Sequence, residues 1–159
     1  MTDASEFLES CQPKWQWHRL RFLALTSRIL CDKTTSLQIN NLMEAAAGYA
    51  LRMPELETMI LWNGARGTAC AFTWCRQGAS LSCRATWEVE LERSAVEAWK
   101  TVAYKKTSRE LTVSREVLAH EIGSHGDAIH HLGLESLVVD NVSLCQIRKE
   151  SERLRVAQL

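Results

Sequence analysis

The sequence predicts an α/β fold in which leucine-rich-repeat-like strand-helix-strand units are extended by an antiparallel β-hairpin and C-terminal helices. Two similar apolar segments support the repeat: residues 20–25 read LRFLAL and residues 56–61 read LETMIL. The long segment between them has apolar residues at helical spacing, which predicts a parallel crossover between two strands. Residues 69–76 and the alternating run 81–91 lie on either side of a short turn and predict the hairpin.

The first unit has a marked start and end to its helix. Thr35 and Gln38 have the spacing of a capping box, and Pro54 lies where the helical pattern stops. We therefore expect a helix from about residue 36 that ends before Pro54. Residues 134–139 read LESLVV and are a weaker third copy of the repeat strand.

The hairpin is expected to be half buried, because apolar and polar residues alternate along its second strand. A turn centred on Ala79 would place Cys75 opposite Cys83. It would also place the small Ala71 opposite the large Trp87, which is a favourable packing arrangement.

Three helices are predicted after the hairpin. Ser94 and Glu97 have capping-box spacing and predict the start of the first helix. Residues 115–122 predict a short second helix. Ser124 and Asp127 predict the start of a third helix, which runs to about residue 131.

A closing helix is predicted over residues 143–159, where a narrow apolar stripe lies beside many charged residues. Such a helix docks by one edge or contacts another chain. We therefore expect a homodimer formed through this helix.

Composition limits the class of protein. The chain has 159 residues, 46% of them hydrophobic, and 19 Lys and Arg residues balance 19 Asp and Glu residues. We expect one domain, residues 1–159, that buries a core without disulfides. No segment is apolar enough to span a membrane and the N-terminus lacks a signal peptide, so a soluble, intracellular (cytoplasmic) protein is expected. The balanced charge argues against nucleic acid and anionic membranes as partners.

The six cysteines carry no metal-binding pattern. None of them forms the Cys-x2-Cys spacing of a zinc knuckle, and the expected intracellular setting is reducing. We expect most of them to be packed thiols. They are Cys11, Cys31, Cys70, Cys75, Cys83 and Cys145.

A histidine cluster is the densest set of titratable groups. His120, His125, His130 and His131 lie within twelve residues together with Asp127. One hypothesis makes His125 or His130 a general base that Asp127 orients. The alternative is that Asp127 only caps the helix start. Adjacent histidines on a helix point about 100° apart, so we expect no metal site.

Aromatic residues suggest a second candidate site. Trp62 precedes a turn-like Asn-Gly pair, and Trp74 shares a hairpin face with Phe72 and Arg76. A hollow between the repeat sheet and the hairpin would bind a flat organic ligand, with His131 as a further candidate contact. The alternative is ordinary core packing of these rings.

Several motifs, in this order, resemble one group of proteins. The C-terminal region of a large group of filamentous-fungal proteins, often labelled F-box proteins, carries similar segments. The resemblance implies a fungal origin and a leucine-rich-repeat-like body, which in longer relatives is the recognition part of a ubiquitin-ligase adaptor. We expect no F-box ahead of the repeats here, and no catalytic residue carries over. The segments are residues 53–64, 86–91, 96–99, 124–132 and 142–147.

Two functions follow as hypotheses. The first is a freestanding recognition module for a small organic ligand or a partner protein. The second is a small cofactor-independent isomerase, dehydratase or cyclase of fungal secondary metabolism, with His125, Asp127 and His130 as acid/base groups in a Trp-lined pocket. Neither hypothesis requires a cofactor.

Overall fold

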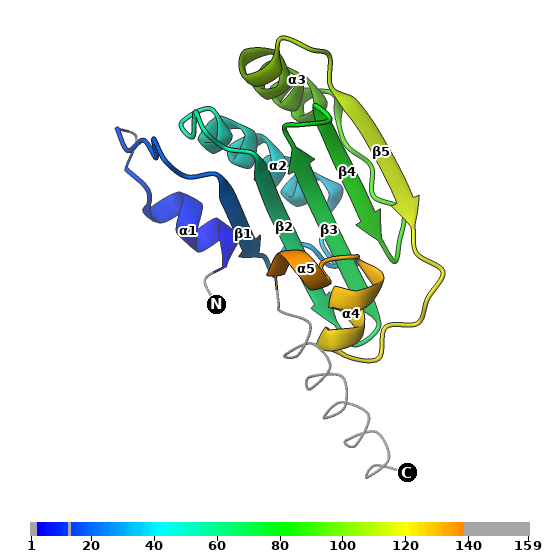
Figure 1. Ribbon diagram of the computed structural model, residues 1–159. Helices are drawn as coiled ribbons and strands as arrows, with labels where there is room; N and C mark the ends of the chain where they lie inside the picture. Colours follow the sequence, from blue (N-terminus) through cyan, green and yellow to red (C-terminus); the bar gives the residue numbers. More distant parts are fainter. Residues whose placement is uncertain (1–2, 13, 139–159) are drawn as a thin grey trace, which may run out of the picture.

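The computed structural model describes residues 3–12 and 14–138, and within these residues it is a mixed α/β fold built on one sheet (Figure 1). The predicted α/β class is confirmed. The strands are β1 (Phe22–Thr26), β2 (Thr58–Ala65), β3 (Thr68–Cys75), β4 (Ser80–Ala85) and β5 (Thr112–Val117). The helices are α1 (Ala4–Ser10), α2 (Ser36–Ala50), α3 (Arg93–Thr107), α4 (His125–His131) and α5 (Glu135–Val138).

The strands lie in the sheet in chain order, β1-β2-β3-β4-β5. Both outer pairs, β1 with β2 and β4 with β5, are parallel, and the two inner pairs are antiparallel. Each parallel pair needs a long connection, which α2 provides for the first pair and α3 for the second. Figure 1 shows α2 and α3 side by side on one face of the sheet, while α4 and α5 lie on the other face.

The leucine-rich-repeat-like organisation is not confirmed. The predicted parallel crossover exists as β1-α2-β2, but β2 then pairs antiparallel with β3 instead of with another parallel strand. The proposed third repeat strand, residues 134–139, is also wrong for its described part, because Glu135–Val138 forms the helix α5. The predicted continuation as a stack of parallel repeats is therefore absent from the described sheet.

The register between β3 and β4 differs from the predicted one. The turn occupies residues 76–79, with Ala79 at its end in a left-handed conformation (φ 46°), so it lies earlier in the chain than a turn centred on Ala79. Because β4 ends at Ala85, Trp87 lies beyond the strand. The expected pairs of Cys75 with Cys83 and of Ala71 with Trp87 are wrong. The observed pairs are Cys75 with Ser80, Phe72 with Cys83, and Ala71 with Arg84.

The main core lies between the sheet and the helices α2 and α3. Trp74 on β3 and Trp99 on α3 are both buried there, with ring centroids 5.8 Å apart. The Trp99 indole N–H donates to the Met43 carbonyl on α2 at 3.0 Å. This bond satisfies a buried polar group and ties the two helices together.

A smaller cluster covers part of the opposite face. Trp62 and Ile60 on β2 pack there against Ile129 of α4. A Cβ added at Gly64 would lie 2.2 Å from the Ala128 Cβ, so α4 approaches the sheet closely only because residue 64 is glycine. The Asn63-Gly64 pair is therefore a packing site within β2, and the chain turns two residues later, at residues 66 and 67.

Two of the three helix starts agree with the capping patterns. Thr35 forms the reciprocal capping box with Gln38, and Ser124 precedes α4 as its N-cap. The Ser94 box is wrong, because α3 begins at Arg93 with Glu92 as N-cap. The buried Asn40 side chain causes this difference: it accepts from the Glu92 N–H at 2.6 Å and donates to the Glu90 carbonyl at 2.9 Å, which holds the chain at the entry to α3.

The short helix predicted over residues 115–122 is also wrong. Residues 112–117 form the strand β5, which lies parallel to β4. The β-branched residues Thr112, Val113 and Val117 favour extended backbone, and pairing with β4 overrides the helical pattern of the following residues. The predicted helix 143–159, the homodimer contact and Cys145 lie outside the described residues.

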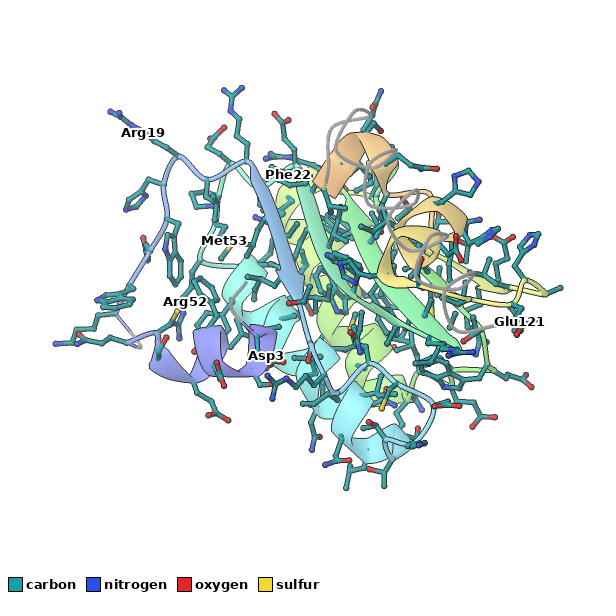
Figure 2. All side chains as sticks on the ribbon, turned by 90° about the horizontal axis from the view of Figure 1, so that it is seen from below. Asp3, Arg19, Phe22, Arg52, Met53 and Glu121 are labelled. Atoms are coloured by element: carbon teal, nitrogen blue, oxygen red, sulfur yellow. The ribbon has the colours of Figure 1, made fainter. Side chains whose placement is uncertain are left out.

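The structure contains no helix, among residues 3–12 and 14–138, with the length and apolar character of a membrane span. Figure 2 shows the loop with Glu121 on the opposite side of the molecule from α1, with the sheet between them.

Candidate functional site

The start of α4 uses the predicted Ser-x-x-Asp motif as a cap. The Ser124 hydroxyl accepts from the Asp127 backbone N–H at 3.1 Å. The Asp127 carboxylate in turn accepts from the Gly123 backbone N–H at 3.1 Å. These two bonds satisfy N–H groups at the start of α4, which is the capping role that the Ser-x-x-Asp motif predicts.

The histidines of the cluster contact different partners. His125 Nδ1 lies 2.8 Å from the Gly64 carbonyl oxygen, and its ring packs at 5.0 Å on Trp62. Because a carbonyl only accepts, Nδ1 is the protonated nitrogen. His130 Nδ1 lies 2.6 Å from the Glu135 carboxylate. His125 is thus bound to the sheet, while His130 is bound to α5.

The remaining pair of histidines is stacked. The rings of His120 and His131 lie 4.3 Å apart with an angle of 16° between their planes. His130 meets His131 edge-on at 5.1 Å. Within residues 3–12 and 14–138, no group of three metal-ligating side chains is arranged to bind a metal ion.

The proposed aromatic hollow is not formed. Trp62 belongs to the cluster beneath α4, whereas Phe72 and Trp74 belong to the core beneath α2 and α3, on the other face of the sheet. Trp62 is 1% exposed and Trp74 is 0% exposed. Arg76 donates to the carbonyls of Pro54 and Lys106, at 3.0 and 3.2 Å. His131 lies on α4, so these five residues do not gather around one ligand.

The open edge of β5 is a feature that the sequence analysis missed. No described strand lies on the outer side of β5, which Figure 1 shows at the edge of the sheet. Its residues are exposed except for Val113, which is half-buried. The Thr112 N–H donates to the Ala79 carbonyl and the Leu118 N–H to the Ala85 carbonyl, both on the β4 side. By the alternation of a strand, every second residue between them directs its backbone groups away from β4. These residues are Val113, Arg115 and Val117.

Two cavities flank this edge, one at each end of β5. The first has a volume of about 310 Å³ and lies between α3 and the loop that precedes β5. The second has a volume of about 290 Å³ and lies between the segment after β4 and the end of β5. The first is lined by Lys100, Tyr104, Arg109, Glu110 and Leu111, and the second by Cys83, Trp87, Glu88, Val89, Arg115, Glu116 and Val117.

Polar contacts hold β5 and the loop before it in place. The Arg84 Nε atom donates to the Glu116 carboxylate at 2.8 Å across β4 and β5. Arg109 donates to the carbonyls of Arg76 and Gln77, at 3.2 and 2.6 Å. The outer edge of β5 is therefore exposed to solvent, while polar contacts hold the strand and the loop before it against the rest of the sheet.

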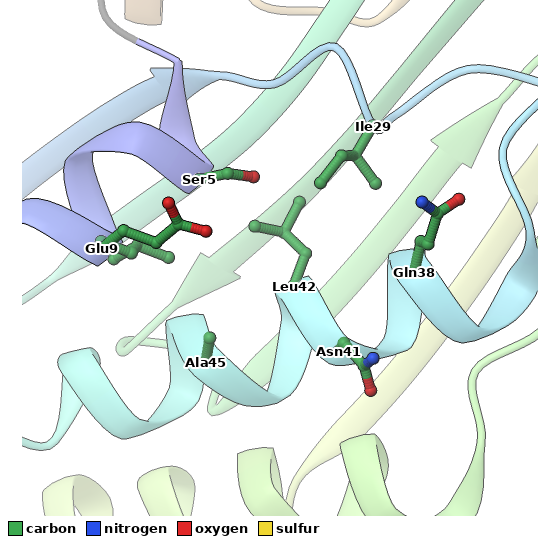
Figure 3. Close-up of a pocket in the computed structure, with 8 residues that line it drawn as sticks. Ser5, Glu9, Ile29, Gln38, Asn41, Leu42 and Ala45 are labelled. Atoms are coloured by element: carbon green, nitrogen blue, oxygen red, sulfur yellow. The ribbon is translucent and has the colours of Figure 1, made fainter.

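A third cavity, of about 290 Å³, lies between α1 and α2. Figure 3 shows Ser5 and Glu9 of α1 facing Leu42 of α2, with Ile29 close by. The floor is apolar and Glu9 brings a negative charge to the rim. The polar residues Gln38 and Asn41 of α2 also line this cavity.

A local signal for β5 does exist in the sequence. Residues 112–117 read TVSREV. Val113 and Val117 are apolar and lie on the same face of a strand, but Arg115 between them on that face is charged. The pattern is weak because an edge strand exposed on both sides needs few apolar residues. The two cavities depend on residues far apart in the chain, so no local pattern predicts them.

Comparison with known protein families gives one match. A model described as a family of unknown function, DUF6546, matches residues 1–140. No curated protein and no solved structure matches the chain. The family match covers the sheet and all the helices described above. The chain therefore belongs to the family of unknown function DUF6546.

Proposed function

We propose that this chain is a protein-recognition module that binds an extended polypeptide by strand addition along β5. The observation that carries this proposal is the open edge of β5, with a cavity at each of its ends. Strand addition uses backbone hydrogen bonds for affinity and pockets for alternate side chains for specificity. Both requirements have counterparts at this edge.

The backbone supplies the first requirement. Val113, Arg115 and Val117 each direct an N–H and a carbonyl away from β4, as the bonds of Thr112 and Leu118 indicate. A polypeptide laid beside β5 would pair with these six groups. Exposed edges of this kind are usually protected in stable monomeric proteins, so an edge that no described strand covers favours a partner.

The cavities supply the second requirement. The side chains of Val113, Arg115 and Val117 share the face that carries α3, so alternate side chains of an added strand would point toward the cavities. In the cavity at the end of β5, Trp87 and Val89 form apolar walls.

The cavity beside the start of β5 is lined by Lys100, Arg109 and Glu110, and Lys100 forms an ion pair with Glu97 at 3.0 Å. About 20 Å of strand separates Leu111 from Val117 at roughly 3.3 Å per residue. A suitable ligand is a stretch of about seven residues with an apolar side chain at the end that lies beside Trp87 and Val89.

The test begins with selection of peptides on the full chain from a random displayed library. The selected peptide is then N-methylated at each position in turn, with the protein left unchanged. Strand addition predicts losses of tenfold or more at alternate positions, because every second peptide N–H pairs with β5. Uniform small losses, or failure to select any peptide, would contradict the proposal.

A protein variant gives a second arm. Val117→Pro removes one outward N–H that makes no bond to β4, and Val117→Thr keeps that N–H with a side chain of similar shape. The selected peptide is expected to bind the Thr variant normally and the Pro variant at least tenfold more weakly. Equal binding to both variants would place the peptide elsewhere, for example in the cavity between α1 and α2.

Two other proposals have less support. Kinship with the recognition part of fungal F-box proteins would assign the same kind of task, and the β5 edge would then hold the substrate protein. Acid/base catalysis of secondary metabolites by His125, Asp127 and His130 has less support, because Asp127 caps α4 and His125 bonds to the Gly64 carbonyl. The double variant His125→Ala, His130→Ala tests it, since an unchanged activity would exclude the catalytic assignment.

A further inference from the structure

We propose that Cys83 is a reactive thiol in the wall of the cavity at the end of β5, and that hydroperoxides entering this cavity oxidise it. The inference concerns a modification site and does not depend on the proposed binding of a polypeptide. It rests on a pair of neighbouring thiols, a cation and a cavity that meet at one place.

Register places the relevant side chains together. Cys83 on β4 pairs with Phe72 on β3 and with Arg115 on β5, so these three side chains share one face of the sheet. Cys70 is the diagonal neighbour of Cys83 across β3 and β4, and both residues are buried on the same face of the sheet. Arg115 is thus the β5 neighbour of a thiol that has a second thiol close to it on β3.

The cavity supplies access. Cys83 is 3% exposed, and it lines the cavity of about 290 Å³ together with Trp87 and Arg115. Cys70 is 0% exposed and is not among the residues that line this cavity. A small oxidant in the cavity therefore meets Cys83 before Cys70.

The two thiols differ in the direction in which their pKa values shift. A hydrogen bond from the Cys70 thiol lowers the pKa of Cys83, burial opposes this effect, and the positive charge of Arg115 adds to it. The same bond raises the pKa of Cys70 well above its ordinary value, and burial raises it further. Of the two thiols, Cys83 is therefore the one that loses its proton more easily, with Cys70 as the neighbouring donor.

The chemical step is balanced by the hydroperoxide itself. The Cys83 thiolate attacks the terminal oxygen, the O–O bond breaks, and the leaving alkoxide or hydroxide takes a proton from water. Sulfur loses two electrons and becomes the sulfenic acid, while the hydroperoxide gains two and becomes an alcohol or water. The Cys70 thiol can then displace water from the sulfenic acid and form a Cys70–Cys83 disulfide.

The experiment exposes the full chain to hydrogen peroxide in the presence of dimedone, and mass spectrometry locates the products. We expect Cys83 to react at least tenfold faster than Cys75 and Cys31, which are half-buried and serve as internal controls. The product is a dimedone adduct on Cys83 or the Cys70–Cys83 disulfide. Faster labelling of either control thiol, or an unmodified Cys83, would overturn the proposal without any variant.

Matched variants test the role of the donor. Cys70→Ser keeps a hydroxyl donor beside Cys83 but cannot form a disulfide, so the dimedone adduct should form at close to the wild-type rate. Cys70→Ala removes the donor, and the rate at Cys83 should fall at least tenfold. Equal rates in the two variants, with the fold checked by circular dichroism, would contradict activation by Cys70.

Discussion

The two edges of the sheet differ sharply in how they are protected. At the β1 edge, residue Asp3 forms a bridge with Thr26, and its carboxylate accepts from the backbone N–H groups of Ser5 and Arg28 at 2.9 and 2.8 Å (Figure 2). Leu25 of β1 is buried in the main core. At the β5 edge, Val117 is 57% exposed, and no described strand or helix lies against the outer backbone groups.

This difference separates an edge strand that a further segment of the chain bridges, β1, from one whose outer backbone groups no described strand pairs with, β5. Both edge strands are attached to the sheet by parallel pairing and a helical crossover, so topology alone does not distinguish them. What distinguishes them is the segment of Asp3 and α1, which bridges the Thr26 end of β1 and has no described equivalent at β5. We therefore place recognition at β5 and stability at β1, and the following predictions test that division.

The largest contrast is expected between two apolar truncations. Leu25→Ala removes a buried side chain at the protected edge and should lower the free energy of unfolding by about 2–5 kcal/mol. Val117→Ala shortens an exposed side chain and should change it by no more than about 0.5 kcal/mol. Urea unfolding of both variants measures the contrast, and similar losses at the two sites would show that β5 is also closed.

A pair of proline variants tests the direction of the β5 backbone groups. Ser114→Pro removes an N–H directed at β4 and leaves its carbonyl partner unsatisfied, so we expect a loss of about 1–3 kcal/mol. Val117→Pro removes an outward N–H and should cost much less. Denaturant unfolding distinguishes the two, and a larger loss for Val117→Pro would reverse the assignment of the open edge.

The Asp3 carboxylate is expected to have a moderate effect. Asp3→Ala removes the cap of α1 and the bond to Arg28, with an expected cost of about 0.5–2 kcal/mol. Amide exchange should accelerate in α1 and β1 while β5 stays unchanged. Equal acceleration at both edges would mean that the cap stabilises the whole sheet and not one edge.

The smallest effect concerns the end of α3, from which the chain enters β5. Burial lowers the pKa of Lys106 to about 8, nearby Arg76 adds to this effect, and Glu55 opposes it. The folded state therefore binds the Lys106 proton less tightly than the unfolded state does. This unfavourable contribution is present below pH 8 and disappears as the pH rises from about 8 to 10.5.

The matched control is Lys106→Met, which keeps the length of the side chain without the charge. Relative to this variant, the wild-type chain should gain a little stability between pH 8 and pH 10, measured by urea unfolding. The gain is small because Lys106 is only half-buried. A constant or falling difference would contradict the lowered pKa.

Local patterns predicted the elements whose causes are local. The Thr35 capping box, the Ser124 cap and the parallel β1-α2-β2 crossover all depend on residues close together in the chain, and the structure contains them. The predicted start of α3 was wrong because the side chain of Asn40, some 50 residues away in the chain, fixes where the helix begins. The strand β5 was missed because its exposed residues carry little apolar alternation.

The candidate site depended even more on distant contacts. Asn63-Gly64 has the composition of a turn, yet Gly64 is needed where α4 packs on β2, and this keeps Trp62 inside the molecule. Phe72 and Trp74 face the opposite side of the sheet, which only the register of the whole sheet determines. His125 and His130 were predicted on the right helix, but their partners, Gly64 and Glu135, lie on other elements.

Amide hydrogen exchange of β5 tests the central claim most directly. The full chain is measured with and without a peptide selected from the random library. Strand addition predicts that the backbone N–H groups of Val113, Arg115 and Val117 become protected on binding, while those of Thr112, Ser114 and Glu116, already directed at β4, change little. Protection confined to the cavity between α1 and α2, or none in β5, would contradict recognition at this edge.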